Sequence, residues 1–409
     1  MNNWKKCKLG DIGKVITGKT PLAKNPEDWG NDMCFITPTD YKDYRKIASS
    51  SIRKLSNIGI ERLKNKILPP RSIMVTCIGS DMGKVAVNKN PSITNQQINS
   101  IIPYEKVADA DFVYYLLVSM YDTLRTYGLD GTAVPILNKS DFETIEILLP
   151  PLEEQRQIAD ILSSIDDKIE LLHEQNKTLE ELAQTLFRHY FIENPNPSWQ
   201  NVKLGDLVEE TIGGEWGKEN PIEDFKVPTY CFRGTDIADL ITGLPKKIPL
   251  RYIKKAKLEK IEPKSGDILL EISGGTETQS TGRAIYIDDN IKKLFNYPIV
   301  FSNFCRLLRA KKIEYSYYLF FYLKYLYGND EFFAFENGSS GIKNLDYKTL
   351  LNNTDCLKPD DEIFSFHKKV VLYFNKINKN KQQIQTLENM RDILIPKLLN
   401  GEIKVGGNQ

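Results

Sequence analysis

The stretch PPLEEQRQIADILSSIDDKIELLHEQNKTLEELAQTLFRHYF (residues 150–191) decides how this chain is organised. It begins with two prolines, which suit the first turn of a helix, and it holds no further proline or glycine. Its apolar positions step by four and three residues, which is typical of a coiled-coil seam. The seam positions are Ile158, Leu162, Ile165, Ile169, Leu172, Asn176, Leu179, Ala183, Leu186 and Tyr190.

A second stripe with the same spacing lies near the end of the chain. Each stripe contains one asparagine, and an unpaired asparagine in an apolar seam costs about 1–3 kcal/mol. We therefore expect Asn176 to face Asn380 in an antiparallel pair, in which both ends of the two stripes are flush and every a position lies opposite a d position. The positions of this second stripe are Phe366, Val370, Tyr373, Ile377, Asn380, Ile384, Leu387, Arg391, Leu394 and Leu398.

This register makes specific predictions for the rest of the seam. Tyr190 should meet Phe366 at one end, and small Ala183 should meet large Tyr373. Arg391 faces an apolar position, and we expect its charged head to reach solvent while its stem packs. Two ordinary amphipathic helices in separate bundles are the alternative.

The segments between the helices repeat each other. WKKCKLGDI (4–12) resembles WQNVKLGDL (199–207), and CFITPTDY (34–41) resembles CFRGTDI (231–237). KTLEEL (177–182) resembles QTLENM (385–390), at a larger offset that indicates longer loops in the second copy. Short apolar runs separated by Gly, Pro and Asn turns indicate an α+β fold in each copy.

The predicted architecture is two tandem related α+β domains separated by two long helices that pair as an antiparallel coiled coil. Such pairing would attach the two globular domains at opposite ends of the coil. We predict a first domain at residues 1–150, a first spacer helix at 151–194, a second domain at 195–358, and a second spacer helix with a C-terminal tail at 359–409.

Composition narrows the class of protein. The chain has 409 residues and a net charge of +1, but residues 151–194 carry 4 basic and 10 acidic side chains. The six cysteines are scattered without a C-x-x-C pair, which argues against a disulfide scaffold or a zinc site and predicts a cytoplasmic protein. No apolar leader is evident at the N-terminus, and YSYYLFFYLKYLYG (315–328) is better interpreted as a buried helix than as a membrane span.

Four stretches together resemble the specificity (S) subunit of type I restriction–modification systems. They are KLGDIGKVITGKTP (8–21), ITNQQIN (93–99), GTAVPILNKSDFETIEILLPPLEEQRQIADIL (131–162) and IPKLLNGEI (395–403). The resemblance implies two target-recognition domains that each read one half of a bipartite site in double-stranded DNA. It also implies that the helices set the gap and recruit DNA methyltransferase subunits, two in our expectation, and restriction subunits through them.

The resemblance implies a chain that is not catalytic and binds no cofactor, since S-adenosylmethionine, ATP and Mg would belong to partner subunits. Gly13, Gly18, Lys19 and Thr20 do match the phosphate-loop pattern G-x-x-x-x-G-K-[ST]. Pro21 follows at once, however, and a working phosphate loop needs a helix there. The histidines lie on the spacer helices and form no nucleophile constellation, and the remaining alternative is a two-headed scaffold that binds proteins.

Candidate DNA contacts are polar side chains in turn-like stretches that occur in both copies, because such side chains bond base edges or phosphates. A solvated turn or a structural role is the alternative for each one, above all for Asn95, Gln97 and the pair Ser302–Asn303. In the first domain the candidates are Lys19, Thr37, Thr39, Lys42, Arg45, Ser80, Lys84, Asn95, Gln96, Gln97, Thr132 and Lys139. In the second domain they are Arg233, Thr235, Ser273, Thr278, Gln279, Arg283, Ser302, Asn303, Ser339, Ser340 and Lys343.

The acidic first spacer helix is poorly suited to lie against phosphate. We expect its outer face, including Asp166, Glu170 and Glu174, to contact a protein partner instead.

Overall fold

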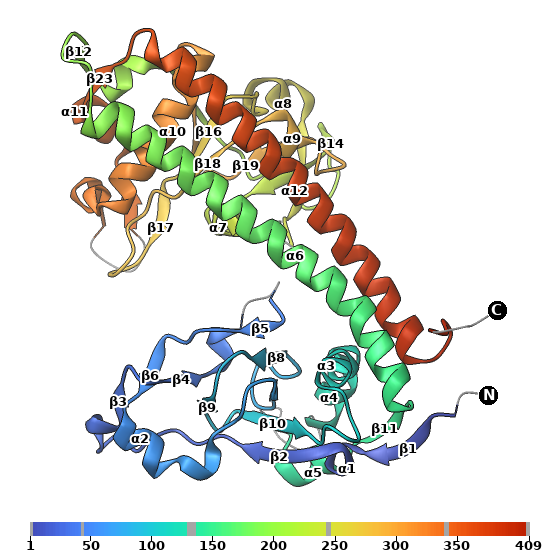
Figure 1. The fold of residues 1–409 in the computed structure, drawn as a ribbon. Coiled ribbons are helices and arrows are strands. Elements are labelled where there is room, and N and C mark those ends of the chain that lie inside the picture. The colour runs from blue at the N-terminus through green and yellow to red at the C-terminus, as the bar shows by residue number, and fades with distance from the viewer. Residues whose placement is uncertain (1–2, 42–44, 129–135, 243–246, 339–342, 406–409) are drawn as a thin grey trace. The chain divides into compact units, whose positions relative to one another are not determined.

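The computed structural model describes residues 3–41, 45–128, 136–242, 247–338 and 343–405. The chain divides into two compact units, the first formed by residues 1–171 and 384–409 and the second by residues 172–383. The long helices α6 (Leu152–Phe187) and α12 (Glu362–Leu399) each contribute residues to both units (Figure 1). The unit boundaries therefore fall inside the helices, whereas the sequence placed domain boundaries at the helix ends.

The first unit contains a central, mostly antiparallel sheet and a smaller mixed sheet. The central sheet has the order β2 (Gly13–Thr17), β10 (Ile98–Pro103), β7 (Ile73–Thr76), β8 (Val85–Asn88) and β5 (Ile47–Ala48). The smaller sheet has the order β3 (Trp29–Gly30), β6 (Arg53–Leu55), β4 (Met33–Ile36) and β9 (Ser92–Thr94), with β4 and β9 parallel. β1 (Lys5–Lys8) pairs with β11 (Glu146–Leu149), which brings the two ends of the domain together.

Helices cover one face of the central sheet. The helices of the first unit are α1 (Leu9–Ile12), α2 (Asn57–Arg62), α3 (Ala110–Ser119), α4 (Tyr121–Gly128) and α5 (Lys139–Thr144). Asp109 caps α3 by accepting hydrogen bonds from two amides of its first turn. Phe112 and Leu117 of α3 are fully buried with Ile73 and Val75 of β7 in one apolar cluster.

The second unit repeats this plan. Its central antiparallel sheet has the order β13 (Val208–Gly213), β20 (Cys305–Ala310), β16 (Ile268–Glu271) and β18 (Ala284–Tyr286). Its smaller sheet has the order β15 (Leu250–Lys254), β14 (Phe225–Phe232) and β19 (Ile299–Phe301), with β14 and β19 parallel. β12 (Gln200–Lys203) pairs with β23 (Asp355–Lys358) as β1 pairs with β11.

The second unit also has a small extra sheet and its own helices. The extra sheet consists of β17 (Ser273–Gly275), β22 (Lys343–Leu345) and β21 (Glu336–Asn337). The helices are α7 (Gly234–Thr242), α8 (Lys255–Ile261), α9 (Asp289–Lys292), α10 (Ile313–Gly328) and α11 (Tyr347–Asn353). The apolar run 315–328 lies in α10, where Tyr318 and Phe321 are fully buried, so the expectation of a buried helix is confirmed.

The repeated motif K-L-G-D has the same structural role in both units. The amide of Lys8 donates to the Asp11 carboxylate at 2.8 Å, and the amide of Lys203 donates to the Asp206 carboxylate at 2.9 Å. The following leucine amide donates to a backbone carbonyl just before the closing strand in both cases. The aspartate thus caps a short helical turn, which explains why the motif recurs.

The asparagine pairing between the long helices is confirmed. The side-chain amide of Asn380 donates to Asn176 Oδ1 and to Gln175 Oε1, both at 2.8 Å. Asn380 is fully buried, so without these acceptors its amide would lose hydrogen bonds that water otherwise supplies. The register that the two asparagines predicted is therefore the register of the antiparallel pair.

The predicted contact between Tyr190 and Phe366 is wrong by one residue. Residues Arg188–Glu193 form a π-helical turn, η4, which holds more residues per turn than an α-helix. The buried stripe therefore moves from Tyr190 to Phe191, whose ring centroid lies 5.0 Å from that of Phe366. Phe187, the last residue of α6, is buried in this core, whereas Leu186 is only partly buried.

The expectation that Arg391 reaches solvent is met only in part, because its head pairs with exposed Asp392 and also with a buried acid across the helices. Its Nη1 lies 2.8 Å from Asp166 Oδ1, and Tyr115 donates its hydroxyl to the other carboxylate oxygen of Asp166 at 2.6 Å. Asp166 is only 8% exposed, so it is an internal ion-pair partner and does not belong to an outer face. The group joins α12, α6 and α3 within the first unit.

Removal of the Arg391 charge should destabilise the first unit. We expect Arg391→Met to lower the free energy of unfolding by about 2–3 kcal/mol, because the buried Asp166 carboxylate would lose its cation. Thermal and denaturant unfolding would measure this. The control is Arg188→Met, which breaks the exposed pair with Glu193 and should cost less than about 1 kcal/mol. Equal losses in the two variants would contradict the assignment.

Candidate nucleic-acid interface

In the first unit, a tight turn joins the small sheet to the central sheet. The turn Asn95–Gln97 follows β9, and the Asn95 amide donates to the Ile36 carbonyl at the end of β4 at 3.2 Å. The Gln97 carbonyl accepts from the Cys77 amide at the end of β7 at 2.7 Å, and the Ile98 amide donates back to Asn95 at 3.2 Å. Three backbone hydrogen bonds thus hold Asn95–Gln97 between the ends of two strands, and we call this segment the clamped turn of the first unit.

The second unit has a clamped turn of the same kind at Ser302–Phe304. The Ser302 amide donates to Phe232 at the end of β14 at 2.9 Å, and the Cys305 amide donates back to Ser302 at 3.0 Å. The Phe304 carbonyl accepts from the amide of Ile272, just after β16, at 2.9 Å. Hydrogen bonding therefore makes three pairs of positions equivalent, namely Asn95 with Ser302, Gln96 with Asn303, and Gln97 with Phe304.

In each unit, the backbone of one glycine lies in close contact with the clamped turn. A side-chain Cβ at Gly18 would lie 2.2 Å from the Asn95 carbonyl oxygen, and one at Gly214 would lie 2.1 Å from the Phe301 carbonyl oxygen. The next amides, of Lys19 and Glu215, donate to the carbonyls of Thr94 and Phe301, both at 2.8 Å. Only glycine leaves room for this approach.

The same contacts argue against a phosphate loop at residues 13–20. The Gly18 and Lys19 amides donate to the backbone carbonyls of Ile98 and Thr94, so neither points at an empty anion site. No helix begins after Thr20, and the chain continues as a loop to η1 (Pro26–Asp28). The glycine of the apparent motif is explained by packing against the clamped turn.

The candidates of the first domain divide into exposed side chains and side chains held by the fold. Asn95 is buried, and its amide donates to Gln97 Oε1 at 2.8 Å, so both side chains are used locally. Thr37 donates its hydroxyl to Asp40, and Arg45 lies 3.2 Å from Glu170 of α6. The exposed candidates are Lys19, Thr39, Ser80, Gln96 and Lys139, while Thr37, Arg45, Lys84 and Gln97 are half-buried, and Lys42 and Thr132 lie outside the described residues.

The candidates of the second domain divide in the same way. Arg233 and Arg283 make two-pronged ion pairs with the buried carboxylates Asp236 and Glu271, and the side-chain hydrogen bonds from these acids raise the pKa of each arginine. Ser302 is only 1% exposed, and this corrects its assignment as a surface contact. Thr235, Thr278, Gln279 and Asn303 are exposed, Ser273 and Lys343 are half-buried, and Ser339 and Ser340 lie outside the described residues.

The structure gathers several of these candidates around each clamped turn. Lys19, Thr37 and Gln96 meet there in the first unit through the ends of β2, β4 and β9. Arg233 and Asn303 meet in the second unit through the ends of β14 and β19. Arg45 pairs instead with Glu170 of α6, and Lys139 pairs with Glu143 of its own helix.

Sequence reasoning missed one exposed residue at this place. Phe304 is 59% exposed although it is aromatic and stands on a clamped turn. Its neighbours Ser302 and Asn303 were already candidates, so the sequence marked this turn but not its aromatic residue. A search restricted to polar side chains cannot find it.

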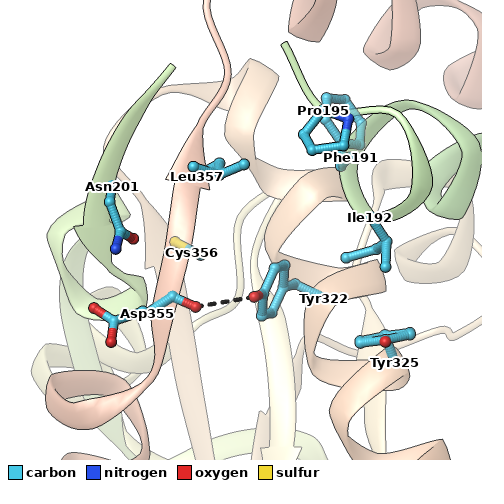
Figure 2. Close-up of a pocket in the computed structure, with 9 residues that line it drawn as sticks. All are labelled: Phe191, Ile192, Pro195, Asn201, Tyr322, Tyr325, Asp355, Cys356 and Leu357. Atoms are coloured by element: carbon cyan, nitrogen blue, oxygen red, sulfur yellow. Dashed lines mark hydrogen bonds between the residues drawn. The ribbon is translucent and has the colours of Figure 1, made fainter. Parts of the chain in front are cut away.

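A separate cavity of about 430 Å³ lies in the second unit (Figure 2). Phe191 and Ile192 at the end of the first spacer helix, Tyr322 and Tyr325 of α10, and Leu357 of β23 line it. The Tyr322 hydroxyl donates to the Asp355 carbonyl at 2.9 Å across one wall. None of the candidate DNA contacts lines this cavity, so it is distinct from the clamped turn.

Two kinds of feature are absent from the ranges that the structure describes. Among the helices that the structure describes, none has both the length and the apolar character that a membrane span requires. Within those same ranges, no group of three or more His, Cys, Asp or Glu side chains is arranged to hold a metal ion.

The chain thus consists of two tandem related α+β domains and two paired helices, and each domain has one clamped turn. The sequence model of the type I restriction–modification DNA specificity domain matches residues 1–181 and again residues 196–389. The chain therefore belongs to this family. It is a DNA-recognition subunit of a type I restriction–modification complex and is not itself an enzyme.

Individual relatives agree with this assignment. The chain is 29% identical to the specificity subunit of type I restriction enzyme MjaIX from Methanocaldococcus jannaschii, over 98% of this chain and 94% of that protein. It is 36% identical to the HindI specificity subunit from Haemophilus influenzae over 45% of this chain and 40% of that protein. A crystal structure of an S subunit from M. genitalium has a similar fold, with a TM-score of 0.56 and 17% identity over 97% of this chain and 96% of that one.

The close approach at Gly18 can be tested directly. We expect Gly18→Ala and Gly214→Ala each to destabilise the protein by several kcal/mol, because the new methyl group would overlap backbone oxygens that cannot move aside. Thermal unfolding would measure the effect. Gly328→Ala is the matched control, since no atom lies within 4 Å of a Cβ there, and it should leave stability nearly unchanged. A stable, normally folded Gly18→Ala variant would contradict the geometry.

Proposed function

We propose that each globular domain reads one half of an asymmetric, bipartite DNA site and that the helix pair fixes the gap between the halves. The observation that carries this proposal is the pair of clamped turns, which have the same backbone hydrogen bonds and different side chains. Gln96 and Asn303 are exposed at equivalent positions, and Thr37 and Arg233 occupy equivalent positions before the capping aspartates Asp40 and Asp236. A common backbone with different polar groups suits two domains that read different bases.

The proposal extends to the partners. We place two DNA methyltransferase subunits on the complex, with restriction subunits joined through them, and S-adenosylmethionine, ATP and Mg bound by those partners. The acidic first spacer helix supports a protein-facing role for its outer side, now restricted to residues such as exposed Glu174, because Asp166 is internal and Glu170 pairs with Arg45. A subunit that acts on cellular DNA would work in the cytoplasm.

A domain exchange tests the assignment of one half-site to each domain. The exchange replaces residues 199–357 by the corresponding segment of a related subunit, which keeps both spacer helices and exchanges β12 together with its partner residues in β23 up to Leu357. Methylation mapping in cells that carry the partner subunits should show one half-site changed, with the other half-site and the gap retained. A change in both halves, or in neither, would refute the assignment.

The contribution of Lys19 to phosphate binding is measurable by salt dependence. We expect Lys19→Ala to weaken binding to all DNA sequences alike and to reduce the slope of log affinity against log salt by about 0.9, the value for one phosphate contact. The control is Lys106→Ala, another exposed lysine of the first unit, which should leave the slope unchanged. Affinity that is independent of salt in the unmodified protein would favour the two-headed protein scaffold instead.

A further inference from the structure

Phe304 is an exposed aromatic residue on a rigid part of the second unit. Its side chain is 59% exposed, while Ser302 and Cys305 beside it are 1% and 0% exposed. The clamped turn fixes its backbone through the hydrogen bonds of Ser302, Phe304 and Cys305. Exposure of a large apolar side chain has a solvation cost, and here no local flexibility accounts for it.

Backbone hydrogen bonds place two segments with polar residues next to the turn that carries Phe304. The hydrogen bond from the Ser302 amide to the Phe232 carbonyl places the turn beside the start of α7, where Arg233 and exposed Thr235 lie. The bond from Ile272 to Phe304 places it beside the loop from Ser273 to Arg283, and its neighbour Asn303 is exposed. Phe304 is thus an apolar group among hydrogen-bonding groups of the kind that bind base edges.

The first unit offers an informative contrast. The equivalent residue there is Gln97, whose side chain accepts a hydrogen bond from Asn95 and is only half exposed. The backbone of the turn therefore does not require an aromatic residue. The aromatic group at the last position of the clamped turn distinguishes the second domain from the first.

We propose that Phe304 determines specificity in the second half-site by packing against the 5-methyl group of a thymine in the major groove. This inference rests on the proposed function, because it assumes that the clamped turn faces DNA. The thymine methyl is the apolar group that the major groove presents, and phenylalanine is among the side chains that contact it. Asparagine bonds the N6 and N7 edge of adenine in that same groove, so Asn303 and Phe304 together favour a step rich in A·T pairs.

The test removes one methyl group at a time. The assembled complex with its methyltransferase subunits would bind duplexes in which each thymine of the mapped second half-site is replaced by deoxyuridine. For the unmodified protein, replacement of thymine by deoxyuridine at one position should weaken binding about fourfold. This is the loss expected when one methyl group is removed from an apolar contact. Phe304→Ala should bind the thymine and deoxyuridine duplexes equally, whereas Phe304→Leu should still distinguish them.

Controls separate this inference from the function on which it rests. Phe364→Ala removes a phenylalanine of similar exposure, 53%, on α12 and should keep the full response to deoxyuridine. Thermal unfolding should show that Phe304→Ala is folded, because the side chain it removes is mostly exposed. If binding is sequence-specific but no deoxyuridine matters, or if Phe304→Ala keeps the response, the inference fails and the function stands.

Three further outcomes are decisive. A second half-site without thymine on either strand, or a Phe304→Ala variant that weakens all sequences alike, would also overturn the inference, the latter by indicating a wedge or backbone contact. Absence of any sequence-specific binding by the unmodified complex would instead overturn the proposed function.

Discussion

Mutual burial of the apolar stripes of α6 and α12 is the constraint on which the rest of the structure depends. In the first unit, Ile158 and Leu162 of α6 share a core with Leu398 of α12 and with the sheet. In the second unit, Ala183 and Phe187 share a core with Phe366 and Val370 and with α10. The helices are therefore part of each domain's core, and neither domain could keep that core if the helices separated.

The sequence was sufficient for the helix register and for the repeat, because both depend on local periodicity and on single polar residues with few alternatives. Asn176 and Asn380 are the single asparagines of their apolar stripes, so each was expected to form its hydrogen bond with the other. The π-helical turn at Arg188–Glu193 was not predictable, because Leu186 and Tyr190 are four residues apart and therefore fit an uninterrupted α-helix. Nor was the pairing of Arg391, since its environment is completed by Tyr115 from a distant segment.

The sequence predicted where the candidate site lies, but it predicted only some of the residues whose side chains face outward there. Turns that recur in both copies did mark the clamped turns, but chemical type alone does not tell an outward-facing side chain from one that stabilises its own turn. Asn95 and Gln97 bond each other, and Ser302 is buried, although all three are of a type that binds bases. The backbone hydrogen bonds hold the turn independently of its side chains. The outward-facing positions can therefore vary without cost to the fold.

The unequal placement of the two asparagines has a consequence for how copies of this protein associate. If α6 paired with α6 of a second copy in the same register, each Asn176 would face Leu172, and in an α12 homodimer each Asn380 would face Ile384. Either arrangement would bury two asparagine amides without hydrogen bonds, at a cost of about 1–3 kcal/mol for each. One asparagine per helix therefore favours pairing of α6 with α12 within one molecule over pairing of identical helices from two molecules.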